Sequence, residues 1–208
     1  MHSLLVTDRL SYTFYRRDFI PAEPDKLWLI KQGIVRTLSW NEQGTYITLG
    51  YWGAQDVLGI PLSNVDPYQI QCLTTVEAWC IPQYQWHQLL PAIYQHIQQT
   101  KEFFCIVRSE RISQRLQQFL VWLSRKFGTE TEQGYLIKLR VTHQEIGESI
   151  GTTRVTVSRL LSQLEREGMI FRSGKNLIIL HHQLWNIKNK FEPLIVEQKQ
   201  ASSIFCLP

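Results

Sequence analysis

Short runs of apolar residues, broken by glycine, proline and asparagine, fill the first 90 residues. They are rich in β-branched and aromatic side chains, and a polar turn at 41–44 separates two of them. Runs of this kind predict an antiparallel sandwich or small barrel. The expected strands are 27–30, 34–38, 45–51, 68–72 and 76–81. The segment has neither a βαβ rhythm nor a phosphate-loop glycine pattern, which argues against a nucleotide-hydrolysing α/β enzyme.

The spacing of apolar residues changes at Pro91, a residue suited to the first position of a helix. From there to Arg111 they recur at alternating steps of four and three residues. The members of this seam are Ile93, Ile97, Thr100, Phe104 and Val107. The spacing is that of a coiled coil and predicts a dimerisation helix, with packing on its own domain as the alternative. Phe103, beside the seam, is expected to touch the strand domain.

A second helix is predicted over 112–127, because apolar residues again fall on one helical face. Its expected buried residues are Leu116, Phe119, Leu120 and Leu123. Gly128 and a polar loop at 129–133 are expected to end it. Short strands are predicted at 135–139 and, much later, at 177–180.

The segment between those two strands predicts a helix, a tight turn and a second helix. Thr142 and Glu145 have the S/T-x-x-E form of a capping box, which starts a helix. Gly151 supplies the break, because a left-handed turn costs glycine least. Thr153 can cap the next helix through its hydroxyl. The arrangement is that of a helix-turn-helix.

The second of these helices has two different faces at about 100° per residue. One is apolar and consists of Val157, Leu160, Leu161 and Leu164. The other consists of Arg154, Val155, Ser158, Arg159 and Ser162. Arginine can give two hydrogen bonds to guanine, and a methyl group can touch thymine, so the second face suits the major groove. An ordinary amphipathic helix with one solvated side is the alternative.

The hairpin predicted over 169–180 places two strands around a polar Ser-Gly-Lys-Asn turn. After a helix-turn-helix it is interpreted as a wing, with Lys175 placed for a DNA phosphate. The charge distribution agrees with this. Residues 1–100 contain 6 basic and 8 acidic residues, whereas residues 101–208 contain 16 and 10, so the positive excess lies in the second half. A basic half of this kind is typical of polyanion binding.

Composition excludes several other classes. No run approaches the roughly 20 apolar residues of a membrane span, and the N-terminus lacks the features of a secretory signal. The four cysteines are scattered without a C-x-x-C pair, which favours a reducing cytoplasm over a disulfide or zinc framework. We therefore expect a cytoplasmic protein with no catalytic residue, no cofactor and no metal site.

The chain resembles the CRP/FNR superfamily of bacterial transcription regulators. The residues that carry the resemblance are H-Q-E-I-G-E-S-I-G-T and T-R-V-T-V-S-R within 138–180, which look most like the cyanobacterial nitrogen-control branch. The resemblance implies that Arg154, Val155, Ser158 and Arg159 face base edges. It also implies that His143, Gln144, Thr153 and Thr156 lie near phosphates. Many members have an acidic residue where this chain has Val155, so its base preference is expected to differ.

The resemblance implies an α+β fold in four parts. These are a cyclic-nucleotide-binding-like antiparallel β-barrel at 1–90, a dimerisation helix at 91–111, a winged helix-turn-helix at 112–184 and a C-terminal extension at 185–208. The implied function is that of a homodimeric regulator that recognises a palindromic promoter site. Its expected partners are double-stranded DNA, a second copy of itself and RNA polymerase, with an unidentified small-molecule effector left open and no membrane.

The effector pocket departs from the family pattern. Nucleotide-binding members need a glutamate for the ribose and an arginine–serine pair for the cyclic phosphate. Here no glutamate follows Gly59 closely, no arginine lies between Arg36 and Arg108, and Asp66 would repel a phosphate. We therefore predict that cyclic AMP is not the effector, and the same missing arginine weakens the case for 2-oxoglutarate.

Two other functions fit the sequence less well. A cupin-like metalloenzyme needs a His/Glu cluster in the strands, but residues 1–86 contain only His2 as histidine. A constitutive architectural DNA binder would bind without sequence preference.

Overall fold

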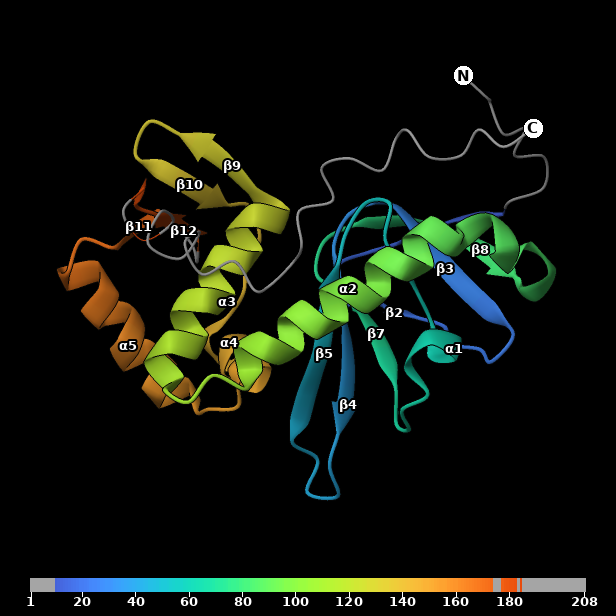
Figure 1. Cartoon of the computed structure of the whole chain (residues 1–208), viewed down its shortest axis with the longest axis horizontal. Coiled ribbons are helices and arrows are strands. Elements are labelled where there is room, and N and C mark those ends of the chain that lie inside the picture. The colour runs from blue at the N-terminus through green and yellow to red at the C-terminus, as the bar shows by residue number, and fades with distance from the viewer. Residues whose placement is uncertain (1–9, 174–176, 183, 185–208) are drawn as a thin grey trace, which may run out of the picture.

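The computed structural model describes residues 10–173, 177–182 and 184. Figure 1 shows a β-rich N-terminal part, a long helix that runs across it, and a C-terminal part of helices and hairpins. The predicted α+β fold is confirmed. The division of the chain at residues 90, 111 and 184 stays a prediction, and the extension 185–208 lies outside the described residues.

Two antiparallel four-stranded sheets form the N-terminal part. The first has the order β1 (Ser11–Phe14), β8 (Val76–Pro82), β3 (Lys26–Gln32) and β6 (Val57–Leu58). The second has the order β2 (Phe19–Ile20), β7 (Gln69–Cys72), β4 (Val35–Trp40) and β5 (Tyr46–Trp52). The five predicted strands are present. Sequence reasoning missed β1, β2 and β6, two of which have only two residues and so no visible period.

Bulky side chains fill the core of this part. Trp28 and Trp52 are only 3% and 2% exposed, and they pack with Ile30, Ile70 and other aliphatic residues. Each indole N–H has an internal acceptor, because Trp28 donates to the carbonyl of Pro21 at 2.7 Å and Trp52 donates to Thr37 Oγ1 at 3.0 Å. The tryptophans thus serve as core residues whose polar groups are satisfied.

After the short helix α1 (Ile60–Ser63) and the 3₁₀ helix η1 (Gln83–Leu89), the chain forms α2 (Leu90–Val107). This helix ends at residue 107, four residues earlier than predicted, and the chain then turns into α3 (Ile112–Phe127). The predicted extent of α3 and its four buried residues are confirmed. Figure 1 shows α2 crossing the strands and ending beside α3.

The C-terminal part contains a third sheet, which corrects the predicted loop after α3. Residues 128–131 form a strand, β9 (Gly128–Thr131), rather than a loop. It pairs with β10 (Gly134–Ile137), and the sheet continues through β12 (Leu177–Leu180) to β11 (Ile170–Ser173). The last two strands are the predicted hairpin. The tip with Lys175 lies outside the described residues.

One hydrophobic core joins the two parts. Tyr51 from β5 and Phe103 from α2 are almost fully buried, and both rings contact Phe119 and Trp122 of α3. The expected contact of Phe103 with the strand domain is therefore confirmed. The same cluster continues into the helix-turn-helix through Ile146, so the two parts share apolar surface. No helix among the described residues is long and apolar enough to cross a membrane.

Candidate nucleic-acid interface

The helix-turn-helix begins with α4 (His143–Ile150). Thr142 caps it, because its hydroxyl accepts a hydrogen bond from the Glu145 N–H at 3.2 Å. The Glu145 carboxylate in turn accepts one from the Thr142 N–H at 2.6 Å. The predicted capping box is thus confirmed in both directions, and it fixes where the helix starts.

The turn after α4 depends on two glycines. Gly151 has φ 69° in the left-handed region, as predicted. Gly147 lies one turn earlier, and its carbonyl accepts a hydrogen bond from the Thr152 N–H at 2.9 Å. A Cβ on Gly147 would lie 2.7 Å from the Thr152 carbonyl oxygen. Only glycine at this position allows the turn to come so close to α4, which sets the angle at which the next helix leaves.

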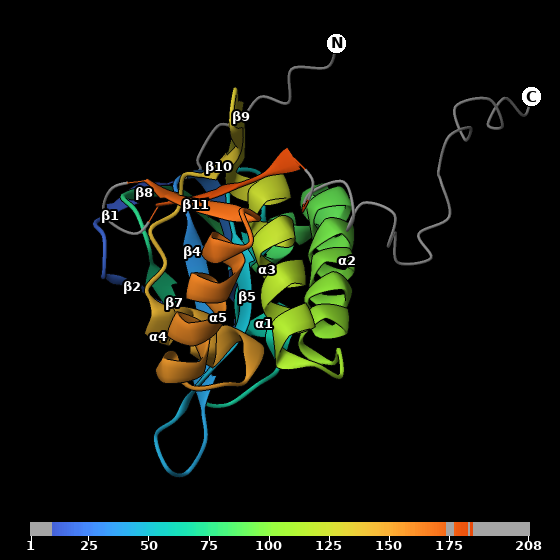
Figure 2. The same cartoon turned by 90° about the vertical axis from the view of Figure 1, so that its left-hand side faces the viewer.

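That next helix, α5 (Arg154–Arg166), separates its two faces as predicted. Thr153 caps it by accepting a hydrogen bond from the Thr156 N–H at 3.2 Å. The apolar face is buried and consists of Val157, Leu160, Leu161 and Leu164. On the opposite face Val155 is 77% exposed. Figure 2 looks onto this side, with α5 in front of the strands of the N-terminal domain.

Two guanidinium groups lie on the outer face of α5. Arg154 and Arg159 are both exposed. Within the described part of the chain, no carboxylate lies within ion-pair distance of either. Their charge is therefore available to an external anion or base edge.

Ser158 differs from its neighbours on this face, because its hydroxyl is occupied. It donates a hydrogen bond to the Arg154 carbonyl at 2.9 Å. Its oxygen also lies 2.7 Å from Nδ1 of His143, the first residue of α4. Burial of the half-buried ring lowers the pKa of His143, and the nearby charges of Arg172 and Arg154 lower it further.

Three more of the residues expected near phosphates lie where the two helices begin: Gln144 in the first turn of α4, and Thr153 and Thr156 at the start of α5. Gln144 is exposed, and its amide donates to Glu148 Oε1 at 3.1 Å. Thr153 and Thr156 belong to the cap of α5, with their hydroxyl oxygens 3.0 Å apart. Lys175 lies outside the described residues.

Arg172 is a further basic residue at this surface that sequence reasoning missed. It lies on β11 and forms an ion pair with Glu165 of α5 at 2.6 Å. It also donates to Ser162 Oγ at 3.1 Å. The pair fixes the wing to the end of α5. In the sequence, Arg172 is marked only by being a basic residue in the strand that follows the helix, and that signal is weak.

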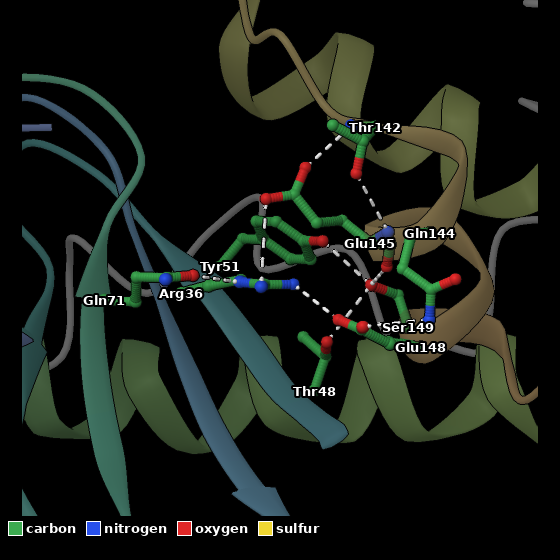
Figure 3. A network of polar contacts seen from close by, with 9 residues as sticks. All are labelled: Arg36, Thr48, Tyr51, Gln71, Thr142, Gln144, Glu145, Glu148 and Ser149. Atoms are coloured by element: carbon green, nitrogen blue, oxygen red, sulfur yellow. Dashed lines mark hydrogen bonds and ion pairs between the residues drawn. The ribbon is translucent and has the colours of Figure 1, made fainter. Parts of the chain in front are cut away.

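The inner side of α4 is anchored to the N-terminal domain by a buried ion-pair network (Figure 3). Arg36 of β4 contacts Glu148 at 3.0 Å and Glu145 at 3.8 Å. Its Nε donates to Gln71 Oε1 at 2.8 Å. The side chains of Arg36 and Glu148 are only 6% and 9% exposed, so each charge needs the other. Nothing in the local sequence identified this network.

A second polar contact lies next to that network, as Figure 3 shows. The hydroxyl of Tyr51 and that of Ser149 on α4 are 2.8 Å apart, and Ser149 also hydrogen-bonds Thr48 at 3.2 Å. Burial raises the pKa of Tyr51 to about 12. The phenol is thus neutral at ordinary pH and keeps its proton for this hydrogen bond. Both contacts hold α4 against β4 and β5.

A half-buried lysine lies at the junction of α3 with the N-terminal part. Lys126 forms an ion pair with Asp56 at 2.9 Å and donates to the Tyr51 carbonyl at 2.6 Å. Its Nζ also lies 5.0 Å from the ring centroid of Trp52 and 5.4 Å from that of Trp122. Burial lowers the pKa of Lys126, while the charge of Asp56 opposes that shift.

The described residues contain no group of three or more His, Cys, Asp or Glu side chains placed to hold a metal ion. The comparisons with known proteins point to regulation instead. A sequence profile of the Crp-like helix-turn-helix domain matches residues 114–184. The regulatory protein CysR of Synechococcus elongatus is 37% identical over 169 residues, which cover 79% of this chain and 81% of that protein. The chain belongs to the CRP/FNR family of transcription regulators.

Other members of the CRP/FNR family agree with this assignment. The global nitrogen regulator of Synechocystis is 31% identical over 182 residues, covering 79% of this chain and 80% of that protein. The predicted position near the cyanobacterial nitrogen-control branch is confirmed. Among solved structures, a CRP-family regulator of Thermus thermophilus aligns with a TM-score of 0.73 at 20% identity, covering 86% of this chain and 95% of that one. FixK2 of Bradyrhizobium japonicum aligns with a TM-score of 0.72 at 16% identity, covering 91% and 100%. These two structures support the CRP/FNR fold.

Proposed function

We propose that this CRP/FNR member is a homodimer that recognises a palindromic DNA site through α5. The observation that carries the proposal is that Arg154 and Arg159, on the exposed face of a helix whose other face is packed, have no carboxylate partner among the described residues. An exposed guanidinium without such a partner suits a guanine edge. Val155 between them offers methyl groups to a thymine.

The dimer surface we propose is the outer face of α2. Not all residues of the predicted seam face outward in the structure. Ile93 and Val107 are half-buried and pack against the protein's own core. Ile97, Thr100 and Phe104 are exposed, although Thr100 also donates to the His96 carbonyl at 2.9 Å.

Two more exposed residues extend the remaining seam. Leu90 is 63% and Tyr94 57% exposed, next to Ile97 at 46% and Phe104 at 61%. Their spacing of four, three and seven residues continues the heptad pattern. This stripe can pack against the same stripe of a second copy of the chain, because a two-fold interface uses the same surface on both subunits. Exposed apolar residues at heptad spacing are the observation that supports it.

A two-fold dimer would place its two copies of α5 on half-sites about one helical turn apart, roughly 10 bp centre to centre. The relation to the nitrogen-control branch favours half-sites of the GTA…TAC kind. RNA polymerase is the further partner that such a regulator needs, and the cytoplasm is where it would meet both.

We propose that this protein works without cyclic AMP. The core shared by the two sheets contains Trp28 and Trp52. Among the described residues of the strand region, Arg36 is the buried arginine, and it already binds Glu148 and Gln71. Calorimetry with cyclic AMP tests this. We expect no saturable binding, and a micromolar dissociation constant would show that the domain holds the nucleotide after all.

Selection of bound DNA from a random pool is the experiment that tests the function. We expect enrichment of a two-fold symmetric sequence. A constitutive architectural binder, the alternative function, would enrich no sequence and would bind random competitor DNA as well as any selected site. The experiment therefore separates the two.

A further inference from the structure

Ser158 contacts both the Arg154 carbonyl and Nδ1 of His143, so the placement of its hydrogen is coupled to which nitrogen of His143 carries one. A serine hydroxyl has a single hydrogen, and because the Arg154 carbonyl, 2.9 Å away, can only accept, we assign that hydrogen to it. With that assignment the Ser158 oxygen accepts from Nδ1 of His143, 2.7 Å away. A neutral imidazole has one N–H, so its other nitrogen, Nε2, is left as a bare acceptor.

The surroundings of this ring disfavour its protonation in the free protein. Burial lowers the pKa of His143 below its usual 6.5, and the nearby charges of Arg172 on β11 and Arg154 on α5 lower it further. The carboxylates of α4 itself are occupied elsewhere, because Glu145 accepts from the Thr142 N–H and Glu148 pairs with Arg36. No carboxylate contributes to the shift in the opposite direction.

We infer that Ser158 is a positioning residue rather than a base reader: it holds the hydrogen of neutral His143 on Nδ1, so that His143 donates to a DNA phosphate only after taking up a second proton. The inference rests on the proposed DNA-binding function. A phosphate oxygen is an acceptor and meets repulsion from a bare Nε2. The imidazolium has N–H groups on both nitrogens and adds a charge.

The sign of the pH effect follows from linkage. A phosphate beside the ring raises the pKa of His143 in the complex above its value in the free protein, so binding takes up a proton. DNA affinity then falls as pH rises from the free pKa to the bound pKa, and it is constant outside that window. Each unit between the two values changes the binding constant by about tenfold.

The test measures DNA affinity between about pH 5.5 and pH 8.5 at constant salt, a range that spans the ordinary titration of histidine. For the unmodified protein we expect affinity to fall by roughly tenfold per protomer across the window. His143→Gln should be flat, because it does not titrate there. Calorimetry in two buffers of different ionisation enthalpy should show proton uptake for the unmodified protein and none for this variant.

Ser158→Ala separates positioning from direct contact. Without the acceptor, the neutral ring is free to carry its hydrogen on Nε2 and to donate to a phosphate at every pH. We expect a shallower pH profile, higher affinity than the unmodified protein near pH 8, and unchanged base preference. A Ser158→Ala profile as steep as the original, or a loss of base preference at one position, would overturn the inference.

Nitrogen NMR of the imidazole in the free protein provides a test that needs no DNA. We expect the neutral ring of His143 to have its hydrogen on Nδ1, and a hydrogen on Nε2 would overturn the inference. If the protein binds no DNA at any pH, the proposed function fails. If it binds with the same pH profile as His143→Gln, only this inference fails.

Discussion

Arginines lie in opposite environments on the two sides of the helix-turn-helix. On the inner side, Arg36 is buried and contacts two carboxylates and an amide. On the outer side, Arg154 and Arg159 are exposed and have no carboxylate partner among the described residues. A buried charge must be paired within the protein, whereas an exposed one can wait for a partner from outside. The difference separates a residue that holds the domain in place from residues that read a ligand.

Removing the inner arginine should give the largest effect on stability. Arg36→Met leaves the Glu148 carboxylate buried without its partner, so we expect the free energy of unfolding to fall by about 3–5 kcal/mol. Urea denaturation measures it. The matched control is Arg154→Met, which removes an exposed, unpaired guanidinium and should change stability by less than about 0.5 kcal/mol. Equal losses in the two variants would remove the distinction between the two sides.

The exposed stripe on α2 extends the comparison to apolar residues. In Ile97→Glu with Phe104→Glu, two carboxylates would be buried without partners on dimerisation. We expect association to weaken by at least about a hundredfold, or roughly 2.7 kcal/mol. Sedimentation measures the oligomeric state. The control is Gln95→Glu with Gln98→Glu, which adds the same charge at exposed positions away from the stripe and should leave the dimer intact. A double stripe variant that still sediments as a dimer would exclude α2 as the interface.

The outer arginines should affect DNA recognition and leave stability alone. Arg159→Ala should lose about 1–3 kcal/mol of binding on the cognate site and flatten the preference at one base pair per half-site. Binding to the cognate site and to its single-base variants measures both. Full base discrimination in this variant would show that the face of α5 has been assigned wrongly.

Lys175 provides the smallest and least specific effect in the comparison. Lys175→Ala should weaken binding to all DNA sequences alike and should lower the slope of affinity against salt by about 1 per protomer. Titrations at several salt concentrations, on cognate and random DNA, measure it. A change in base preference would mean that this residue does more than meet a phosphate.

Local signals in the sequence predicted the helix-turn-helix well. The capping box of Thr142 and Glu145, the turn at Gly151 and the buried face of α5 each depend on residues a few positions apart. The periodicity of α2 predicted a helix but not which residues face outward, because both sides of that helix are apolar. Ile93 and Val107 consequently pack inward. Contacts between distant residues left no local signal, as for Arg36 and Glu148, which are 112 positions apart.

Lys126 lies close to two tryptophans at the junction between the two parts, so movement there should change their fluorescence. Its ammonium group lies over both Trp52 and Trp122, and the Trp52 ring is also stacked on His96 with the centroids 4.1 Å apart. Indole emission depends on charges close to the ring, and these two indoles come from β5 and α3. Any movement of α3 relative to the strands changes the distance from the ammonium to at least one of the two rings. The protein therefore contains its own fluorophores for following rearrangement at this junction, without an attached dye.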